Sequence, residues 1–163
     1  DAEIAEVADL LRIDNAAIVD ARWVDNGPGW IAVMLASAAA VLAVDPARYH
    51  SRRIDIGIVG PHSAGNDAAS EIRAIFSDAH GTLIEDPVCG SLNASVGQWL
   101  FARGHARDRY VATQGGRVGR DGRIDVSQDE LGQVWVGGRT ITLFEVLKRR
   151  FTREPECERV ALA

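Results

Sequence analysis

Apolar residues recur at helical spacing near the N-terminus and then in strand-like runs. Residues 3–11 carry apolar side chains at positions 4, 7, 8 and 11, which predicts a short amphipathic helix. Residues 16–25 favour a strand, and the Asn-Gly-Pro-Gly run at 26–29 ends it. Residues 30–35 are almost continuously apolar, which predicts a strand buried on both faces. Residues 38–44 predict a helix that the preceding serine caps and an Asp-Pro pair ends.

The middle of the chain predicts two further strands and one interior helix. Residues 54–59 alternate like a half-exposed strand, and residues 72–76 form another. A loop through Gly81 then leads to a turn at Asp86-Pro87. Within 92–101, apolar residues at positions 92, 96 and 100 fall on one helical face, with further apolar residues beside them. Because this helix is apolar over much of its circumference, we expect it inside the domain.

The last third of the chain reads as a succession of short strands. Glycine-bearing turns separate four of them, at 109–113, 123–127, 133–136 and 140–147. Together with the interior helix, this order of elements predicts an α+β domain. We expect a curved, mainly antiparallel sheet wrapped around that helix.

Composition and charge exclude several classes of function. The chain has 163 residues, is 47% hydrophobic and 25% charged, and carries a net charge of −5. The negative charge argues against a nucleic-acid or anionic-membrane surface, and no apolar run reaches the ~18 residues of a spanning helix. Cys89 and Cys157 form no disulfide framework or CxxC motif, and no histidine pair has metal-ligand spacing. We therefore expect a cytoplasmic protein with no metal site.

The main candidate functional residues lie in the run from Asp86 to Ser91. Proline at 87 forces Asp86 into an extended conformation, and Gly90 lets the backbone approach a ligand closely. Ser91 is placed to act as the N-cap of the interior helix. The free N–H groups of the first turn, with the positive end of the helix dipole, would seat a substrate carboxylate. Cys89 lies beside that end, which would lower its thiol pKa.

A purely structural interpretation of the same run stays open. Ser91 then caps a helix, Gly90 makes a turn, and Cys89 is a small buried hydrophobic residue. Glu85 could likewise act as an acid or base, or only orient the loop that carries Asp86.

The wider sequence resembles one family. The run from Glu85 to Ser95 (EDPVCGSLNAS), followed by Gln-Trp-Leu at 98–100, resembles the EDPxTGSxNA signature of PhzF-like (phenazine-biosynthesis) isomerases. Four flanking segments also resemble family motifs in the right order: residues 25–30, 72–76, 114–120 and 134–138. The resemblance covers residues 1–147 and leaves 148–163 as a C-terminal tail.

The resemblance implies a diaminopimelate-epimerase-like fold and only the C-terminal half of the enzyme. In the family, two similar domains face each other across a cleft, and the acid/base glutamate lies in the N-terminal domain. Nothing in this sequence corresponds to that glutamate. The chain is therefore expected to be a fragment or to need an N-terminal half as partner, with little activity alone. The complete enzyme is expected to be a homo-oligomer, such as a dimer.

The resemblance also implies roles for individual residues. Asp86 would hydrogen-bond the substrate near the migrating proton, and Gly90 and Ser91 would hold the substrate carboxylate. Asn26 and Gly27 would line the cleft, although a plain turn between strands explains them equally well. The activity implied is cofactor-independent proton transfer on a small carboxylate-bearing substrate.

Two alternatives follow from the departures from the family pattern. Cys89 stands where the family more often has threonine. In the related epimerases and racemases, a cysteine just before this glycine is one of two proton-transferring bases, so a cysteine-based amino-acid racemase is the first alternative. The second is a non-catalytic binding domain that keeps the fold without the acid/base half.

Overall fold

The computed structural model describes residues 2–141, which form one sheet and three helices. The helices are α1 (Ala2–Leu11), α2 (Ala38–Ala43) and α3 (Gly90–Ala102), with 3-10 turns at η1 (Asn15–Ala17) and η2 (Gly116–Val118). The strands are β1 (Ile18–Asp25), β2 (Gly29–Leu35), β3 (Asp55–Pro61), β4 (Ser70–Ser77), β5 (Leu83–Asp86), β6 (Arg109–Gln114), β7 (Gly122–Gln128) and β8 (Val134–Gly138). No helix in this part of the chain has the length and hydropathy to cross a membrane.

The sheet is mixed but mainly antiparallel. Its strands lie in the order β1-β2-β3-β4-β6-β7-β8, and β5 pairs with β4 off this path. The β2–β3 and β4–β6 pairs are parallel, and the other pairs are antiparallel. Each parallel pair needs a crossover connection, and the two crossovers contain α2 and α3.

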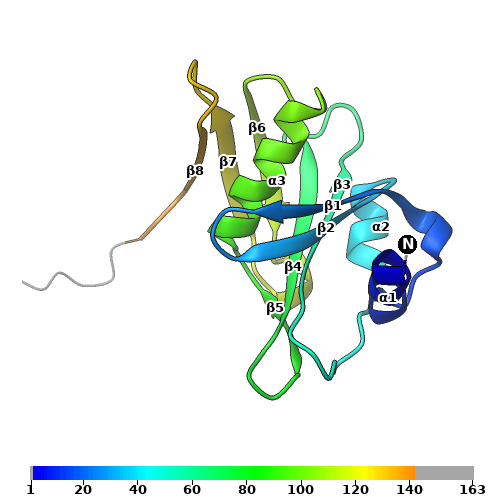
Figure 1. Cartoon of the computed structure of the whole chain (residues 1–163). Coiled ribbons are helices and arrows are strands. Elements are labelled where there is room, and N and C mark those ends of the chain that lie inside the picture. The colour runs from blue at the N-terminus through cyan, green and yellow to red at the C-terminus, as the bar shows by residue number, and fades with distance from the viewer. Residues whose placement is uncertain (1, 142–163) are drawn as a thin grey trace, which may run out of the picture.

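The two crossover helices cover opposite faces of the sheet (Figure 1). Both crossovers move in the same direction across the sheet, but β2 and β4 run in opposite directions. Since crossovers are almost always right-handed, this reversal requires the helices to lie on different faces. α3 accordingly packs in one core with β4, β6 and β7, whereas α1 and α2 pack in a second core with β2 and β3.

Two glycines let α3 come close to the sheet that surrounds it. A Cβ atom at Gly57 on β3 would lie 2.4 Å from Cδ1 of Leu92 on the helix. A Cβ atom at Gly97 on the helix would lie 2.8 Å from Cγ1 of Val126 on β7. Real side chains at either position would push the helix away, so these glycines set its depth in the sheet.

The structure confirms most of the elements predicted from the sequence. The N-terminal helix, the capping of α2 by Ser37, the interior helix and the mainly antiparallel sheet are all present. Two expectations are wrong. β3 is buried on both faces because α2 and α3 cover it from opposite sides, and the expected loop before Asp86 contains strand β5. The strand expected at 140–147 falls almost wholly outside the described residues.

The sheet forks along one edge of β4, and this fork places the start of α3. Residues 70–72 of β4 pair with β6, whereas residues 74–77 pair with β5. β5 and β6 therefore diverge at Arg73. The chain leaves β5 at Asp86 and enters α3 at Gly90 beside this opening.

The side chain of Gln114, at the end of β6, closes the fork. It is 1% exposed. Its Nε2 donates to the carbonyl oxygen of Asp86 at 2.9 Å, and its Oε1 accepts from the N–H of Cys89 at 3.3 Å. The same Oε1 accepts from Nδ2 of Asn93 at 2.8 Å, and that Nδ2 also donates to the carbonyl oxygen of Cys89 at 2.8 Å. One buried amide thus joins β5, β6 and α3.

Buried charges lie along the other face of β4. Arg73 is 2% exposed and forms a bidentate ion pair with Glu85, with Nη2 to Oε2 at 2.7 Å. Its Nη1 also donates to the carbonyl oxygens of Val41 and Val44 at the end of α2. Glu71 is 4% exposed, accepts from the hydroxyl of Thr113, and has no hydrogen-bond partner at Oε1 among the described residues. Burial raises the pKa of Glu71.

Replacement of Gln114 by alanine should destabilise the fold by about 2–4 kcal/mol, because it leaves the buried N–H of Cys89 without an acceptor and the carbonyl oxygen of Asp86 without its donor. Urea unfolding followed by circular dichroism measures this loss. Gln133→Ala is the matched control, since Gln133 is exposed beyond β7, and it should change stability by less than about 0.5 kcal/mol. Equal effects of the two substitutions would contradict the role given to Gln114.

The pH dependence of stability should report the burial of Glu71. The pKa of Glu71 is raised in the fold. The contribution of this side chain to the free energy of unfolding is therefore fully present below the unfolded-state pKa, and it is lost as the pH rises through the folded-state pKa. Glu71→Gln keeps the side chain neutral, so its stability relative to wild type should improve as the pH rises from about 4 to about 8. Denaturant unfolding across this range measures the trend, with exposed Glu130→Gln as control. A difference in free energy of unfolding between Glu71→Gln and wild type that does not change with pH would contradict this expectation.

Candidate functional site

Asp86 and Glu85 are adjacent at the end of β5, but they lie on opposite faces of the sheet. In the β4–β5 ladder Glu85 pairs with Ile75, which lies in the core under α1 and α2, whereas Asp86 pairs with Ala74, which lies in the core around α3. Glu85 is held by the ion pair with Arg73. This geometry supports the structural interpretation of Glu85 and leaves Asp86 as the carboxylate on the side of α3.

The backbone between Asp86 and the helix forms a tight connection. Oδ1 of Asp86 accepts from the N–H of Val88 at 3.1 Å. The carbonyl group of Pro87 lies against Gly115, where a Cβ atom would be 2.6 Å from the carbonyl oxygen. Gly115 also has φ of +90°, which favours glycine. The segment that carries Asp86 is therefore held from both sides before the helix begins.

The helix begins earlier than expected, so the prediction of Ser91 as the N-cap is wrong. Cys89 occupies the N-cap position and Gly90 is the first helical residue. Ser91 lies in the first turn, partly buried, with its Oγ 3.4 Å from Sγ of Cys89. The reason is the hydrogen bond from the N–H of Cys89 to Gln114, which fixes the chain one turn before the apolar stretch starts. The first-turn N–H groups have no partner inside the helix.

The expected lowering of the Cys89 pKa is also wrong. Cys89 is 7% exposed, and burial raises the pKa of its thiol. The hydroxyl of Ser91 and the N–H of Leu92 act in the opposite direction, and the negative charge of Asp86 raises the pKa further. The desolvation of a charged sulfur outweighs the helix end here. Cys89 is a protonated thiol at neutral pH.

Asn26 and Gly27 form the exposed turn between β1 and β2. Gly27 has φ of +109°, and its N–H donates to Oδ1 of Asp25 at 2.8 Å. β1 begins near the C-terminal end of α3, where Asp20 pairs with Arg103, and the hairpin turn lies toward the other end of that helix (Figure 1). Within residues 2–141, the side chain of Asn26 makes no hydrogen bond to the run 86–91.

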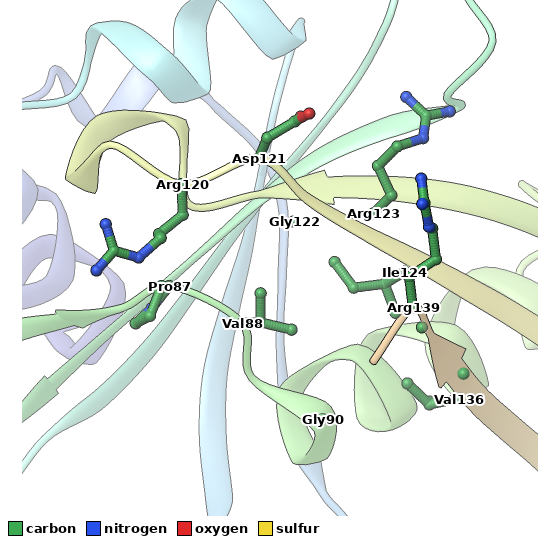
Figure 2. A pocket seen from close by; sticks show the side chains of 12 residues that line it. Pro87, Val88, Gly90, Arg120, Asp121, Gly122, Arg123, Ile124, Val136 and Arg139 are labelled. Atoms are coloured by element: carbon green, nitrogen blue, oxygen red, sulfur yellow. The ribbon is translucent and has the colours of Figure 1, made fainter. Parts of the chain in front are cut away.

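A cavity of about 540 Å³ opens beside the start of α3 (Figure 2). The run before the helix forms one wall, through Pro87, Val88 and Gly90, and the β7–β8 hairpin forms the other. Gly90 is the one candidate site residue among those that line it. The cavity is not lined by Asp86, Cys89 or Ser91.

Three arginines at the rim of this cavity were not singled out from the sequence. They are Arg120, Arg123 and Arg139. Arg120 belongs to a segment that resembles the family, but its role could not be read from that resemblance. Gln114 lies in the same segment, and no local pattern marks an interior glutamine at the end of a strand as a partner of a distant helix.

No group of three or more potential metal-ligating side chains occurs within residues 2–141.

Comparisons with known proteins agree on one family. A family model described as phenazine biosynthesis-like protein matches residues 1–146. An uncharacterized isomerase of Pasteurella multocida is 23% identical over 145 residues, which are 88% of this chain and 49% of that protein. An uncharacterized isomerase of Bacillus subtilis, YfhB, is 31% identical over 58 residues, which are 35% of this chain and 20% of that protein.

The fold agrees with a solved structure. The crystal structure of a PhzF-family phenazine biosynthesis protein from Bacillus anthracis matches with a TM-score of 0.65 and 17% identity. The match covers 82% of this chain and 50% of that protein, so the chain spans about half the length of the relatives it matches most fully. The α+β domain therefore has the diaminopimelate-epimerase-like fold, and the chain belongs to the phenazine biosynthesis-like (PhzC-PhzF) protein family.

Proposed function

We propose that this chain is the substrate-holding half of an isomerase that moves a proton on a small carboxylate-bearing substrate without a cofactor. The observation that carries the proposal is the placement of Asp86 at the end of β5, a few residues before Gly90 begins the long interior helix. A carboxylate that lies beside the positive end of a helix can assist proton transfer while the helix end holds the substrate. An N-terminal half of the family's kind would supply the acid/base glutamate from across the cleft.

Each residue at the helix start has a distinct proposed task. The N–H groups of Gly90 and Ser91, together with the Ser91 hydroxyl, bind the substrate carboxylate. Asp86 hydrogen-bonds the substrate close to the carbon that loses or gains the proton. Gln114 touches no substrate and acts as a positioning residue, because it holds the backbone of Asp86 and Cys89. The orientation of the site therefore rests on a buried hydrogen bond and not on a mobile loop.

The alternative of a cysteine-based racemase receives no support from Cys89. A cysteine that removes the proton works as a thiolate, and burial raises the pKa of this thiol, which disfavours that form. The proposal therefore assigns Cys89 the packing position that threonine more often fills in the family.

Deuterium incorporation tests the proton transfer. This chain is joined to the N-terminal half of the Bacillus anthracis family member, and the chimera is incubated in D₂O with a panel of small carboxylic acids. We expect mass spectrometry to show deuterium in at least one acid. Asp86→Asn should slow incorporation at least about a hundredfold, since general acid–base groups contribute factors of that order. Ser91→Ala should raise KM by about tenfold through a lost charge-assisted hydrogen bond.

Matched variants separate the proposal from its rivals. Asp108→Asn changes an exposed aspartate in a loop and should leave the rate unchanged. Cys89→Ala should also keep most of the activity, whereas the racemase alternative requires its loss. If Asp86→Asn and Ser91→Ala both turn over like the parent chimera, the proposed site is wrong. If no acid exchanges deuterium, a non-catalytic binding domain is the better description.

Alkylation of Cys89 should be slow in the folded chain. A Cys157→Ser background leaves Cys89 as the one thiol, and iodoacetamide labelling is followed by mass spectrometry across pH 7–9. The rate should stay well below that of the same chain in concentrated urea, because the folded thiol is both buried and protonated. Equal rates in the two states across pH 7–9 would contradict the burial and the raised pKa of this thiol.

A further inference from the structure

A row of hydrogen bonds joins three strands on the face of the sheet away from α3. His62 directly follows β3, Glu71 lies in β4 and Thr113 lies in β6. Nε2 of His62 lies 2.8 Å from Oγ1 of Thr113, and this hydroxyl donates to Oε2 of Glu71. The same Nε2 lies 3.7 Å from Oε2 of Glu71. The three side chains therefore form one polar cluster, and the proposed function does not use it.

Strand register places this cluster at the fork in the sheet. Glu71 pairs with Thr113 in the β4–β6 ladder, which joins residues 70–72 to residues 112–114. Thr113 directly precedes Gln114, whose amide closes the fork on the side of α3. One short ladder thus carries the cluster on one face and Gln114 on the other. A change in the cluster acts on the same strand end that holds Gln114.

Glu71 is enclosed without a full set of partners. It pairs with Gly60 in the β3–β4 ladder, and a Cβ atom at Gly60 would lie 2.5 Å from the carbonyl oxygen of Ser37, the N-cap of α2. The start of α2 therefore covers this part of the sheet. Glu71 is 4% exposed, and its Oε1 has no hydrogen-bond partner among residues 2–141. An ionised carboxylate placed in this way is costly, because a buried charge needs partners.

The charged neighbours of Glu71 offset this cost only in part. Burial raises the pKa of Glu71, and the charge of Glu85 acts in the same direction. The hydroxyl of Thr113 and the charges of His62 and Arg73 lower it. Arg73 directs its hydrogen bonds to Glu85 and to backbone carbonyl groups at the end of α2. The balance favours the protonated carboxylic acid while the fork is closed.

The other elements packed around the cluster add one more ion pair. Arg123 on β7 is the ladder partner of Thr113, and it lies 2.9 Å from Oδ2 of Asp67. α2 carries only alanine, valine and leucine side chains, so it brings no charge to Glu71.

The cluster can arrange its protons in two ways without moving its heavy atoms. When Glu71 is ionised, the hydroxyl of Thr113 donates to it and can accept from an Nε2–H group of His62. When Glu71 is protonated, its O–H donates to Thr113. That hydroxyl then donates to Nε2 of His62 or to the carbonyl oxygen of Ser70, at 3.4 Å. The side chain of His62 is 17% exposed, so the proton has a path between Glu71 and solvent.

We infer that His62, Thr113 and Glu71 form a proton-linked clamp on the fork of the sheet, which holds Gln114 firmly when Glu71 is protonated and loosens when Glu71 is ionised. Loosening is a local opening of the short β4–β6 ladder that brings the carboxylate into water. Glu71 and Thr113 are then positioning residues that act on the start of α3 through Gln114. The clamp needs no substrate, whereas its control of turnover rests on the proposed function.

Amide hydrogen exchange of the 163-residue chain between pH 4 and pH 8 tests the clamp. The N–H of Cys89 donates to Gln114, so its protection factor reports the opening of the fork. Because the pKa of Glu71 is higher in the closed fork than in water, protection should fall as the pH rises and level off above the folded-state pKa. The limiting slope is about tenfold per pH unit. In Glu71→Gln the protection factor of Cys89 should not depend on pH.

Two substitutions at Thr113 separate the hydroxyl from its packing. Thr113→Val keeps the volume and removes the hydroxyl, whereas Thr113→Ser keeps the hydroxyl and removes the methyl group. We expect Thr113→Val to lower the protection factor of Cys89 about tenfold at pH 5, through the lost buried hydrogen bonds. Thr113→Ser should stay close to wild type. Thr140→Val makes the same change at an exposed position and should have no effect.

Three results would overturn the inference. The first is a protection factor of Cys89 with the same pH dependence in wild type and in Glu71→Gln. The second is a larger loss in Thr113→Ser than in Thr113→Val, which would assign Thr113 a packing role. The third is an exchange free energy at Cys89 equal to the free energy of global unfolding from urea denaturation, since the fork then has no opening of its own.

The isomerase chimera separates this inference from the proposed function. An inactive chimera, with pH-dependent protection of Cys89 in the 163-residue chain, would remove the proposed function and leave the clamp. An active chimera with protection that does not change with pH would remove the clamp alone. If both hold, Thr113→Val should slow deuterium incorporation by the chimera, and Thr113→Ser should restore it.

Discussion

The buried amide of Gln114 is the contact on which the geometry around α3 depends. A helix that starts inside a domain brings backbone groups out of water, and each such group needs a partner. Gln114 meets this requirement for three segments at once, because it bonds Asp86, Cys89 and Asn93 across the fork in the sheet. Buried polar networks of this kind specify one arrangement when their members are satisfied. The position of Asp86 relative to the helix follows from it.

Much of the architecture could be predicted from periodicity. The helical spacing in α1, the cap and stop signals of α2 and the apolar circumference of α3 all identify their elements without tertiary information. β3 could not be read correctly, because Asp55 and Gly57 break its apolar run although both faces are covered. β5 was missed since it is four residues long and pairs only with part of β4. Its existence depends on a distant strand.

The start of the interior helix was predicted in its location more than in its details. The run that follows Asp86 does open the interior helix, but Ser91 is not its cap and the Cys89 thiol pKa moves upward. Both errors have one cause. Local patterns show the helix end and its dipole, whereas the hydrogen bond from Gln114 and the burial of the sulfur come from residues that are distant in sequence. Arg123 and Arg139 were missed for the same reason, since the β7–β8 register places them at the same end of the ladder.

The burial of Cys89 has a consequence for how the chain withstands oxidants. Hydrogen peroxide attacks thiolates that solvent can reach, and the products, from sulfenic acid onward, are larger and more polar than a thiol. At this position such a product would have to fit against Ser91 and the first turn of α3. A sulfur that is 7% exposed and protonated resists the first of these steps. The start of the helix should thus keep its shape in oxidising surroundings, an advantage that a catalytic thiolate at this place would forfeit.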